Sequence, residues 1–368
     1  MSSRLVLFLP SLVAGGAERV FVDLANEFAR QGHAVDLALA AAEGPFLSEV
    51  SRAVRVVDLR AGGVLRSLRP LARHLRRERP AAILSGLEHA NIVSVAARRW
   101  SFTRTRVVVS TRGVPTMLGI EAGASSRTVL AVARVSYRLA DAVIANSHGV
   151  ADDMSRHLRL PRGRIQVIYN PLDLPTIEAR AAADVAHPFA APGAPPLVLA
   201  VGRFSPLKDF STLLRAFAAL RSRRDGRLVI LGDGVERAAL EALARELGVA
   251  ADFALPGFDA NPFAWMRRAA VFVSSSLSEG CPNALMQALA CGTPVVTTDA
   301  VGGSAEIVEG GRWGRVVPVG DVAAMAAAIE ATLGERTHPD GRARAADFSL
   351  PQVARQYLRV MLPAAEGR

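Results

Sequence analysis

The chain has 368 residues, of which 50% are hydrophobic and 5% aromatic, and its formal net charge is +10. This length and hydrophobic content predict two globular domains and exclude a disordered chain. The chain has only 2 cysteines, which excludes a disulfide scaffold, and it has no run of about 18 apolar residues and no signal-peptide core, so we expect a cytoplasmic protein.

The first domain is expected over residues 1–172, where short apolar strands alternate with amphipathic helical segments. Near-continuous apolar strands indicate a parallel sheet covered on both faces. The first strand, residues 4–9, precedes the sequence GGAER at Gly15 and Gly16. Glycines at this place let the backbone approach a diphosphate closely, although a plain tight turn is the alternative. The other strands of this domain are expected to begin at residues 34, 54, 81, 106, 142 and 165.

The positive charge belongs to this first domain. Residues 1–170 contain 24 arginines and 13 acidic residues, a balance of +11, whereas residues 171–368 contain 20 basic and 21 acidic residues, a balance of −1. The segment 66–79 is a basic amphipathic helix by its spacing, which favours an anionic membrane surface and a phospholipid-linked acceptor. A solvated arginine-rich helix is the alternative, and nucleic acid is disfavoured because no nucleic-acid module is recognisable. The arginines of this segment are Arg66, Arg69, Arg73, Arg76, Arg77 and Arg79.

Residues 173–196 are rich in Pro and Ala and lack strong periodicity, which is typical of a linker. A second domain is expected over residues 197–347, with strands beginning at residues 197, 227, 271, 294 and 315. Arg203 and Lys208 follow its first strand, and Lys208 is the only lysine in the chain. A planar guanidinium and a flexible ammonium together suit a pyrophosphate, whereas the chance survival of one surface lysine is the alternative.

The segment 271–296 combines a buried strand, a loop with Glu279 and a helix expected to begin at Asn283. A helix N-terminus suits phosphate oxygens, and a carboxylate suits sugar hydroxyls, so this segment predicts a site for a sugar attached to a phosphate. An ordinary strand–loop–helix is the alternative. Cys281 and Cys291 show no metal-ligand spacing. Neither GGAER nor LGDGVER is a GxGxxG fingerprint, which disfavours a nicotinamide enzyme.

These motifs in this order resemble the family 4 retaining glycosyltransferases, and the resemblance covers nearly the whole chain. It implies the α/β fold called GT-B, in which two Rossmann-like parallel-sheet domains face a central cleft and a C-terminal helix, here within residues 348–368, crosses back to the N-terminal domain. The segments that carry the resemblance are LPSLVAGGAERVFVDLANEFARQGHAV, DAVIANSHGVADDM, VIYNPLD, VGRFSPLKDF, LVILGDGVER, LPGF, SEGCPNALMQALACGTPVV and GRVVPVGD.

The resemblance also implies a reaction. A sugar would leave a nucleoside diphosphate, with uridine the favoured base, and join a hydroxyl of a lipid-linked or envelope polysaccharide intermediate with retention of its anomeric configuration. The enzyme would need no metal and no other cofactor, and it would act in the cytoplasm or on the inner face of the membrane. Arg203 and Lys208 would neutralise the leaving diphosphate, and Glu279 would bind the sugar hydroxyls. The donor-binding set would be Gly15, Gly16, Gly257, Phe258, Cys281, Pro282, Asn283, Ala284 and Gln287.

Two residues depart from the family pattern. Gln287 stands where the family has a second glutamate for the ribose hydroxyls, and its amide keeps a carbonyl acceptor without the charge. Arg112 stands near the place where many relatives have a histidine. Arg112 therefore joins Glu88 and His89 as an acceptor-side candidate, although a polar residue at the start of a helix is the simpler interpretation of His89. Ser147 is expected to cap the helix that begins near His148.

Two other functions remain open at this level. One is a different sugar-nucleotide enzyme of the same fold, such as an epimerase or a pyridoxal-phosphate phosphorylase in which Lys208 would form the Schiff base. The other is a non-catalytic binder of a nucleotide-sugar, which would bind the donor without turning it over.

Overall fold

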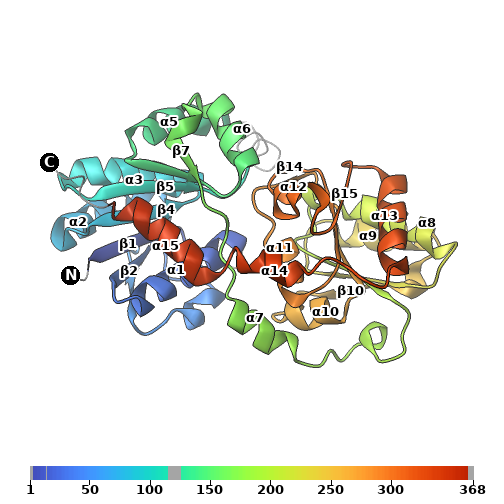
Figure 1. Ribbon diagram of the computed structural model, residues 1–368. Coiled ribbons are helices and arrows are strands. Elements are labelled where there is room, and N and C mark those ends of the chain that lie inside the picture. The colour runs from blue at the N-terminus through green and yellow to red at the C-terminus, as the bar shows by residue number, and fades with distance from the viewer. Residues whose placement is uncertain (1–2, 14, 115–125, 364–368) are drawn as a thin grey trace. The chain divides into compact units, whose positions relative to one another are not determined.

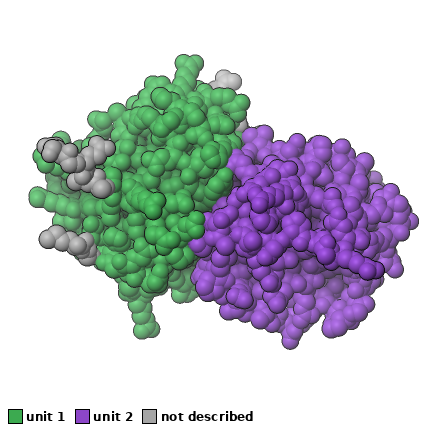
Figure 2. Space-filling model, viewed as in Figure 1, with its two compact units in different colours: residues 1–171, 350–368 green, residues 172–349 purple. Residues whose placement is uncertain are grey.

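The computed structural model describes residues 3–13, 15–114 and 126–363, and the chain forms two compact units (Figure 2). Unit 1 comprises residues 1–171 and 350–368, and unit 2 comprises residues 172–349. Within the described residues, no helix combines the length and the apolar character needed to cross a bilayer.

Within the described residues, unit 1 contains a seven-stranded parallel sheet in the order β3-β2-β1-β4-β5-β6-β7 (Figure 1). The apolar runs of the sequence predicted all of these strands. The order reverses between β1 and β4, and such a switch point is where open α/β sheets bind ligands. The strands are β1 (Arg4–Leu9), β2 (Ala34–Leu39), β3 (Val54–Asp58), β4 (Ala82–Gly86), β5 (Arg106–Thr111), β6 (Ala142–Ala145) and β7 (Ile165–Val167).

Helices cover both faces of this sheet, because side chains of a strand point alternately to its two faces. Val6 and Phe8 belong to a core cluster that includes residues of α2 (Leu68–Glu78), α3 (Glu88–Ser101), α5 (Ser126–Leu139) and α6 (His148–Leu158). Leu5, Leu7 and Leu9 belong to a second cluster with residues of α1 (Gly16–Arg30) and α15 (Leu350–Met361). The helix at the end of the chain therefore packs on unit 1.

Unit 2 repeats this strand order. Its described residues form a six-stranded parallel sheet in the order β10-β9-β8-β11-β13-β15, and β12 pairs with β14. The switch point here lies between β8 and β11. The strands are β8 (Leu197–Val201), β9 (Arg227–Leu231), β10 (Phe253–Gly257), β11 (Val271–Ser274), β12 (Ser278–Glu279), β13 (Val295–Thr298), β14 (Val301–Gly302) and β15 (Arg315–Val317).

One layer of unit 2 contains α8 (Phe210–Arg221), α9 (Arg237–Glu246) and α13 (Val322–Gly334), whose buried residues share a core cluster with β8 and β9. Further helices are α10 (Pro262–Arg268), α11 (Asn283–Cys291), α12 (Ser304–Ile307) and α14 (Gly341–Ala346). β10, β12 and β14 were not predicted from the sequence. β12 and β14 have only two residues each, and in β10 a Pro and a Gly interrupt the apolar pattern.

Residues 173–196, predicted to be a linker, lie inside unit 2 instead. Asp173 caps α7 (Leu174–Ala181), because its side chain accepts a hydrogen bond from the amide of Thr176. Ile177 and Ala181 of α7 are buried, and the helix packs on α10 and α11. The Pro/Ala-rich composition thus reflects a short helix and an irregular segment that both pack within unit 2. Neither has the long periodic pattern of a regular element.

Candidate active site

The loops that follow β8 and β11 lie side by side at the switch point of unit 2. β8 and β11 are adjacent and parallel, so their carboxyl ends meet at one edge of the sheet. The amide of Leu277 donates to the carbonyl of Leu207 over 2.8 Å, and the Ser275 hydroxyl donates to the carbonyl of Lys208 over 2.8 Å. These bonds hold the predicted cation loop against the predicted carboxylate loop.

At this junction the Lys208 ammonium forms an ion pair with Oε1 of Glu279. The Ser276 hydroxyl donates to the same oxygen over 2.8 Å, so two groups orient the carboxylate. The side chains of Lys208 and Glu279 are 26% and 15% exposed, which leaves both within reach of a ligand. The two residues assigned to the diphosphate and to the sugar are therefore direct neighbours.

Glycines allow the loops after β8 and β9 to approach closely here. The Lys208 stem crosses Gly202, where an added Cβ would lie 3.1 Å from Lys208 Cε. Gly232 has φ +137°, and a Cβ there would overlap the carbonyl oxygen of Gly202. Gly234 has φ +156°, and a Cβ there would lie only 2.4 Å from the carbonyl oxygen of Phe204. The LGDGVER motif thus places the end of β9 against the cation loop, which explains its glycines without a dinucleotide.

Arg203 differs from Lys208. It is exposed, and its side chain forms no ion pair or hydrogen bond within the described part of the chain. The predicted pair of cations thus consists of the Lys208 ammonium, which is paired with Glu279, and the Arg203 guanidinium, which is exposed to solvent. Their joint role toward a diphosphate remains a prediction.

The helix predicted to follow Glu279 is α11, and it begins at Asn283 as expected. Asn283, Ala284 and Gln287 are half-buried, whereas Leu285 and Met286 between them are buried. Residues three and four apart share a helix face, so these three side chains form one partly open face. The preceding residues are Cys281 and Pro282, both buried, and the thiol of Cys281 lies 3.4 Å from the sulfur of Met286. Any donor contact by Cys281 or Pro282 would therefore come from the backbone.

The predicted base-binding pair lies at the end of β10. Gly257 has φ +102°, and its carbonyl accepts a hydrogen bond from the amide of Gly232 over 2.9 Å. Phe258 follows with 73% of its surface exposed, so it is not a core residue. An exposed ring at the ligand edge of the sheet suits stacking on a base, and this role remains a prediction.

Two parts of this site were not predicted from the sequence. One is Ser276, which orients Glu279. The other is the loop at Gly302 and Gly303, where β14 pairs with β12 and the amide of Gly303 donates to the carbonyl of Glu279 over 2.9 Å. The serine run after β11 and the double glycine after β13 were the available signals. Among the described residues, no group of three His, Cys, Asp or Glu side chains is arranged to hold a metal ion.

In unit 1, the predicted residues also follow the carboxyl ends of strands. Gly15 is the N-cap of α1, which begins at Gly16. Glu88 begins α3 directly after β4, and burial raises the pKa of its carboxyl. His89 is exposed in the first turn of that helix, in keeping with a polar residue at a helix start. The Ser147 hydroxyl caps α6 by accepting from the Val150 amide, which confirms the predicted cap.

Arg112 follows β5 in an unusual environment. Its Nη1 donates to Oδ1 of Asn170 over 2.8 Å, and its guanidinium lies 5.3 Å from the centre of the Phe21 ring and 5.7 Å from that of Tyr357. Its Nε and Nη2 are buried and make no hydrogen bond within the described residues. Leaving such donors unsatisfied costs about 1–3 kcal/mol each, which a structural role does not explain.

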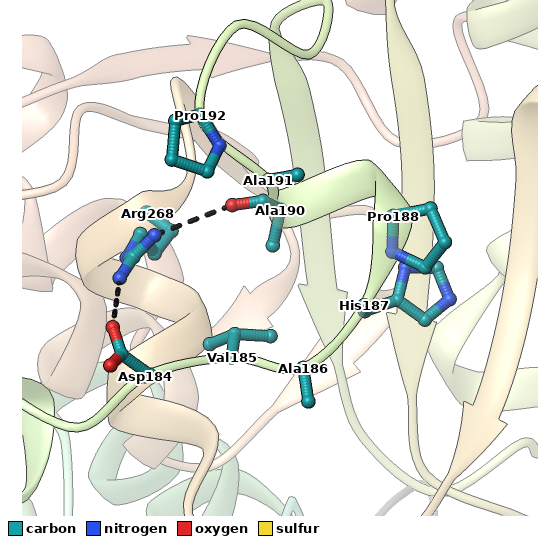
Figure 3. Close-up of a pocket in the computed structure, with 9 residues that line it drawn as sticks. All are labelled: Asp184, Val185, Ala186, His187, Pro188, Ala190, Ala191, Pro192 and Arg268. Atoms are coloured by element: carbon teal, nitrogen blue, oxygen red, sulfur yellow. Dashed lines mark hydrogen bonds and ion pairs between the residues drawn. The ribbon is translucent and has the colours of Figure 1, made fainter.

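A pocket of about 490 Å³ elsewhere in unit 2 does not belong to this site (Figure 3). Residues 184–188 and 190–192 line it together with Arg268, which donates to Asp184 over 2.7 Å and to the carbonyl of Ala190 over 3.4 Å. These residues precede β8 and β11, so the pocket lies at the amino edge of the sheet. The predicted site lies at the opposite edge.

Comparison with known proteins identifies the family. Residues 14–175 match the model of Glycosyltransferase Family 4, and residues 195–335 match that of Glycosyl transferases group 1. The lipopolysaccharide core biosynthesis glycosyltransferase LpsE of Rhizobium meliloti is 30% identical over 330 residues, which cover 88% of this chain and 87% of LpsE. The chain belongs to the family 4 glycosyltransferases. This glycosyltransferase is also 29% identical over 281 residues, 75% of its length, to the N-acetylgalactosamine-N,N'-diacetylbacillosaminyl-diphospho-undecaprenol 4-alpha-N-acetylgalactosaminyltransferase of Campylobacter jejuni, of which 74% is covered.

Solved structures show that this glycosyltransferase has the predicted GT-B fold with two Rossmann-like sheets. HepE of Anabaena, solved in complex with UDP-glucose, matches it with a TM-score of 0.82 at 21% identity, over 98% of this chain and 99% of HepE. The sucrose-phosphate synthase of Thermosynechococcus elongatus matches with a TM-score of 0.80 at 22% identity, over 97% and 98% of the two chains. At such identities the likeness concerns the fold.

Proposed function

We propose that this glycosyltransferase moves a sugar from a UDP-sugar to a hydroxyl of a lipid-linked glycan intermediate, with retention of configuration and without a metal. The observation that carries the proposal is the Lys208–Glu279 ion pair at the switch point of unit 2, oriented by Ser276. The HepE complex with UDP-glucose supports the donor class. The name of the Campylobacter jejuni relative, which acts on a diphospho-undecaprenol, supports the acceptor class.

The proposed reaction assigns a role to each of these groups. The bond between the anomeric carbon and the diphosphate oxygen breaks, and the oxygen keeps the electron pair. Lys208 and Arg203 stabilise the charge that develops on the diphosphate, and each charge-assisted hydrogen bond contributes about 1.5–3 kcal/mol. The acceptor oxygen forms the new bond from the same face, and its proton passes to the leaving diphosphate. Glu279 holds the hydroxyls of the sugar meanwhile.

The test is an assay of nucleoside diphosphate release with a panel of UDP-, GDP- and ADP-sugars, in the presence of a chelator. We expect release only from a UDP-sugar, only with an undecaprenyl-diphosphate-linked acceptor, and an unchanged rate in the chelator. NMR of the product should show the anomeric configuration of the donor. Inverted product, loss of activity in the chelator, or binding of donor without turnover on any acceptor would each contradict part of the proposal.

A further inference from the structure

Exposed apolar side chains gather on one layer of unit 1. The layer consists of α2, α3 and α5, which pack side by side on the same face of the sheet (Figure 1). Of the large hydrophobic side chains that are exposed in the described part of unit 1, only Val13 and Val56 lie elsewhere. Those on or beside the layer are Leu65, Trp100, Phe102, Val132, Val135 and Leu139.

The outer surface of the same layer is strongly basic. Arg66, Arg69 and Arg73 are exposed and form no ion pair within the described residues, and Arg99 and Arg104 extend the surface beyond α3. The Arg69 guanidinium lies 5.5 Å from the centre of the Trp100 ring, and that of Arg76 lies 5.7 Å from the centre of the Phe102 ring. Trp100 is 47% exposed and Phe102 is 83% exposed, so the rings and the cations share one surface.

This arrangement corrects the sequence-based interpretation of residues 66–79 as an amphipathic helix that is available to a membrane. Leu71 and Leu75, on the apolar face of α2, have no exposed surface because they pack in the core of unit 1. The apolar anchors come instead from the end of the neighbouring helix, at Trp100 and Phe102. The helix supplies charge, and its neighbours supply the apolar contact.

We propose that the outer surface of the α2–α3–α5 layer docks on an anionic lipid bilayer. Tryptophan and phenylalanine beside arginine suit the membrane–water interface, where the rings enter the headgroup region and the guanidinium groups bind phosphates. The aliphatic side chains of Val132, Val135 and Leu139 suit contact with lipid, whereas they can neither stack on bases nor bind the phosphates of a nucleic acid. Guanidinium groups already lie near the Trp100 and Phe102 rings, which disfavours stacking of bases.

The placement also fits the proposed function, on which this inference builds. A helix between two parallel strands runs opposite to them, so α2 begins at the carboxyl edge of the sheet. Leu65 and Arg66 therefore lie at the edge where Glu88 and Arg112 follow their strands. Trp100 and Phe102 stand at the end of α3 and by the same rule lie at the opposite, amino edge. The docking surface therefore extends along the helices, and its end at Leu65 and Arg66 is the part nearest to the acceptor-side residues.

The test is co-sedimentation of the full-length protein with vesicles, without donor or acceptor, so that its result does not depend on the proposed reaction. One set of vesicles contains phosphatidylcholine alone and the other an equal mixture of phosphatidylcholine and phosphatidylglycerol. Two variants probe the surface independently, Trp100→Ser/Phe102→Ser and Arg69→Glu/Arg73→Glu. The matched controls are Val235→Ser and Arg245→Glu/Arg336→Glu, which change exposed residues of unit 2 by the same chemistry.

We expect the wild-type protein to bind the anionic vesicles only, with weaker binding at high salt. Each surface variant should lower the partition coefficient by about tenfold or more, and each control should change it by less than about twofold. Circular dichroism would verify that the variants are folded. Absence of wild-type binding, or equal losses in the controls, would refute the docking surface. Equal binding of a DNA duplex that the same variants abolish would assign the surface to nucleic acid instead.

Discussion

Lys208 is the only lysine among 44 basic residues, and its surroundings explain why an arginine would not serve. Its stem crosses Gly202, and its ammonium meets Glu279 in a space bounded by two loops. A planar guanidinium is larger and has a fixed fork geometry, so charge alone would not preserve the contact. We therefore predict that Lys208→Arg lowers kcat/KM by at least about tenfold, equivalent to about 1.4 kcal/mol.

Steady-state kinetics with the preferred donor would measure this effect. The reverse exchange at an exposed position of α9, Arg245→Lys, serves as the control and should leave kcat/KM unchanged. Full activity in Lys208→Arg would show that only the positive charge matters at this position.

Arg112 differs from Lys208, because two of its buried nitrogens, Nε and Nη2, have no hydrogen-bond acceptor among the described residues. A methionine of similar length would lie between Phe21 and Tyr357 without the two unsatisfied nitrogens. We predict that Arg112→Met leaves the free energy of unfolding unchanged or raises it by about 1–3 kcal/mol, while kcat/KM for the acceptor falls at least about tenfold. Denaturant titration and kinetics would test the two parts separately.

Arg156→Met removes the same charge from an exposed site of unit 1 and should change neither quantity. If Arg112→Met lost stability but kept its activity, the guanidinium would be structural. The acceptor-side assignment would then be wrong.

At the scale of elements, the end of β9 is held against the end of β8 by glycine. Alanine at Gly232 would be strained by the positive φ and would also overlap the carbonyl of Gly202, whereas alanine at Gly248, with φ +70°, meets no atom within 4 Å. We predict that Gly248→Ala costs about 1–2 kcal/mol from backbone strain alone. Gly232→Ala should cost more and should weaken donor binding at least about tenfold, because the loop that carries Lys208 must move.

Isothermal titration calorimetry with the donor nucleotide would compare the two variants. Equal donor affinity in both would mean that the approach of β9 to β8 does not shape the site.

β2 is tied to α2 through a buried carboxylate. Burial of Asp36 opposes ionisation, but hydrogen bonds from His74, 3.0 Å away, and from Arg55 outweigh it and lower its pKa from 3.8 to about 2. A lowered pKa adds stability above the unfolded-state value, and that stability is lost as the pH falls through 3.8 toward 2. We predict that Asp36→Asn lowers the free energy of unfolding by about 2 kcal/mol near neutral pH.

Urea titrations over a pH series would show the difference between wild type and Asp36→Asn shrinking in acid. Glu246→Gln, at an exposed position, should show no such trend. A difference that grew in acid would contradict the assigned sign.

At the scale of the whole molecule, unit 1 is assembled from both ends of the chain. Tyr357 of α15 has no exposed surface and lies in the core cluster with α1 and the strands of unit 1. We predict that Tyr357→Ala lowers the stability of unit 1 by about 3–5 kcal/mol and leaves unit 2 unchanged. Hydrogen exchange should therefore rise in α1, β4 and β5, which contact α15, and stay constant in β8 and β11.

Arg359→Ala, an exposed neighbour on α15, should leave the exchange pattern unaltered. A rise in exchange that reached β8 and β11 would show that the two units unfold as one.

The sequence by itself determined which segments form most of the strands in both sheets. Parallel strands buried on both faces are continuous apolar runs, and ligands bind at their carboxyl ends. The pattern of apolar runs was therefore enough to place Glu88, Arg112 and Glu279 at the ends of strands. The predicted start of α11 at Asn283 was also confirmed. The start of a helix depends on residues that are close in sequence, so a local pattern is enough to predict it.

The tertiary structure alone decided which of these residues meet. Lys208 and Glu279 are 71 residues apart, and their pairing depends on β11 lying beside β8, an order that no local pattern encodes. The burial of side chains likewise depends on contacts between segments that are far apart in the sequence. The apolar face of α2 packs on the sheet of unit 1, and residues 173–196 pack within unit 2. Local pattern predicts which residues form an element, whereas packing between distant elements determines what each side chain contacts.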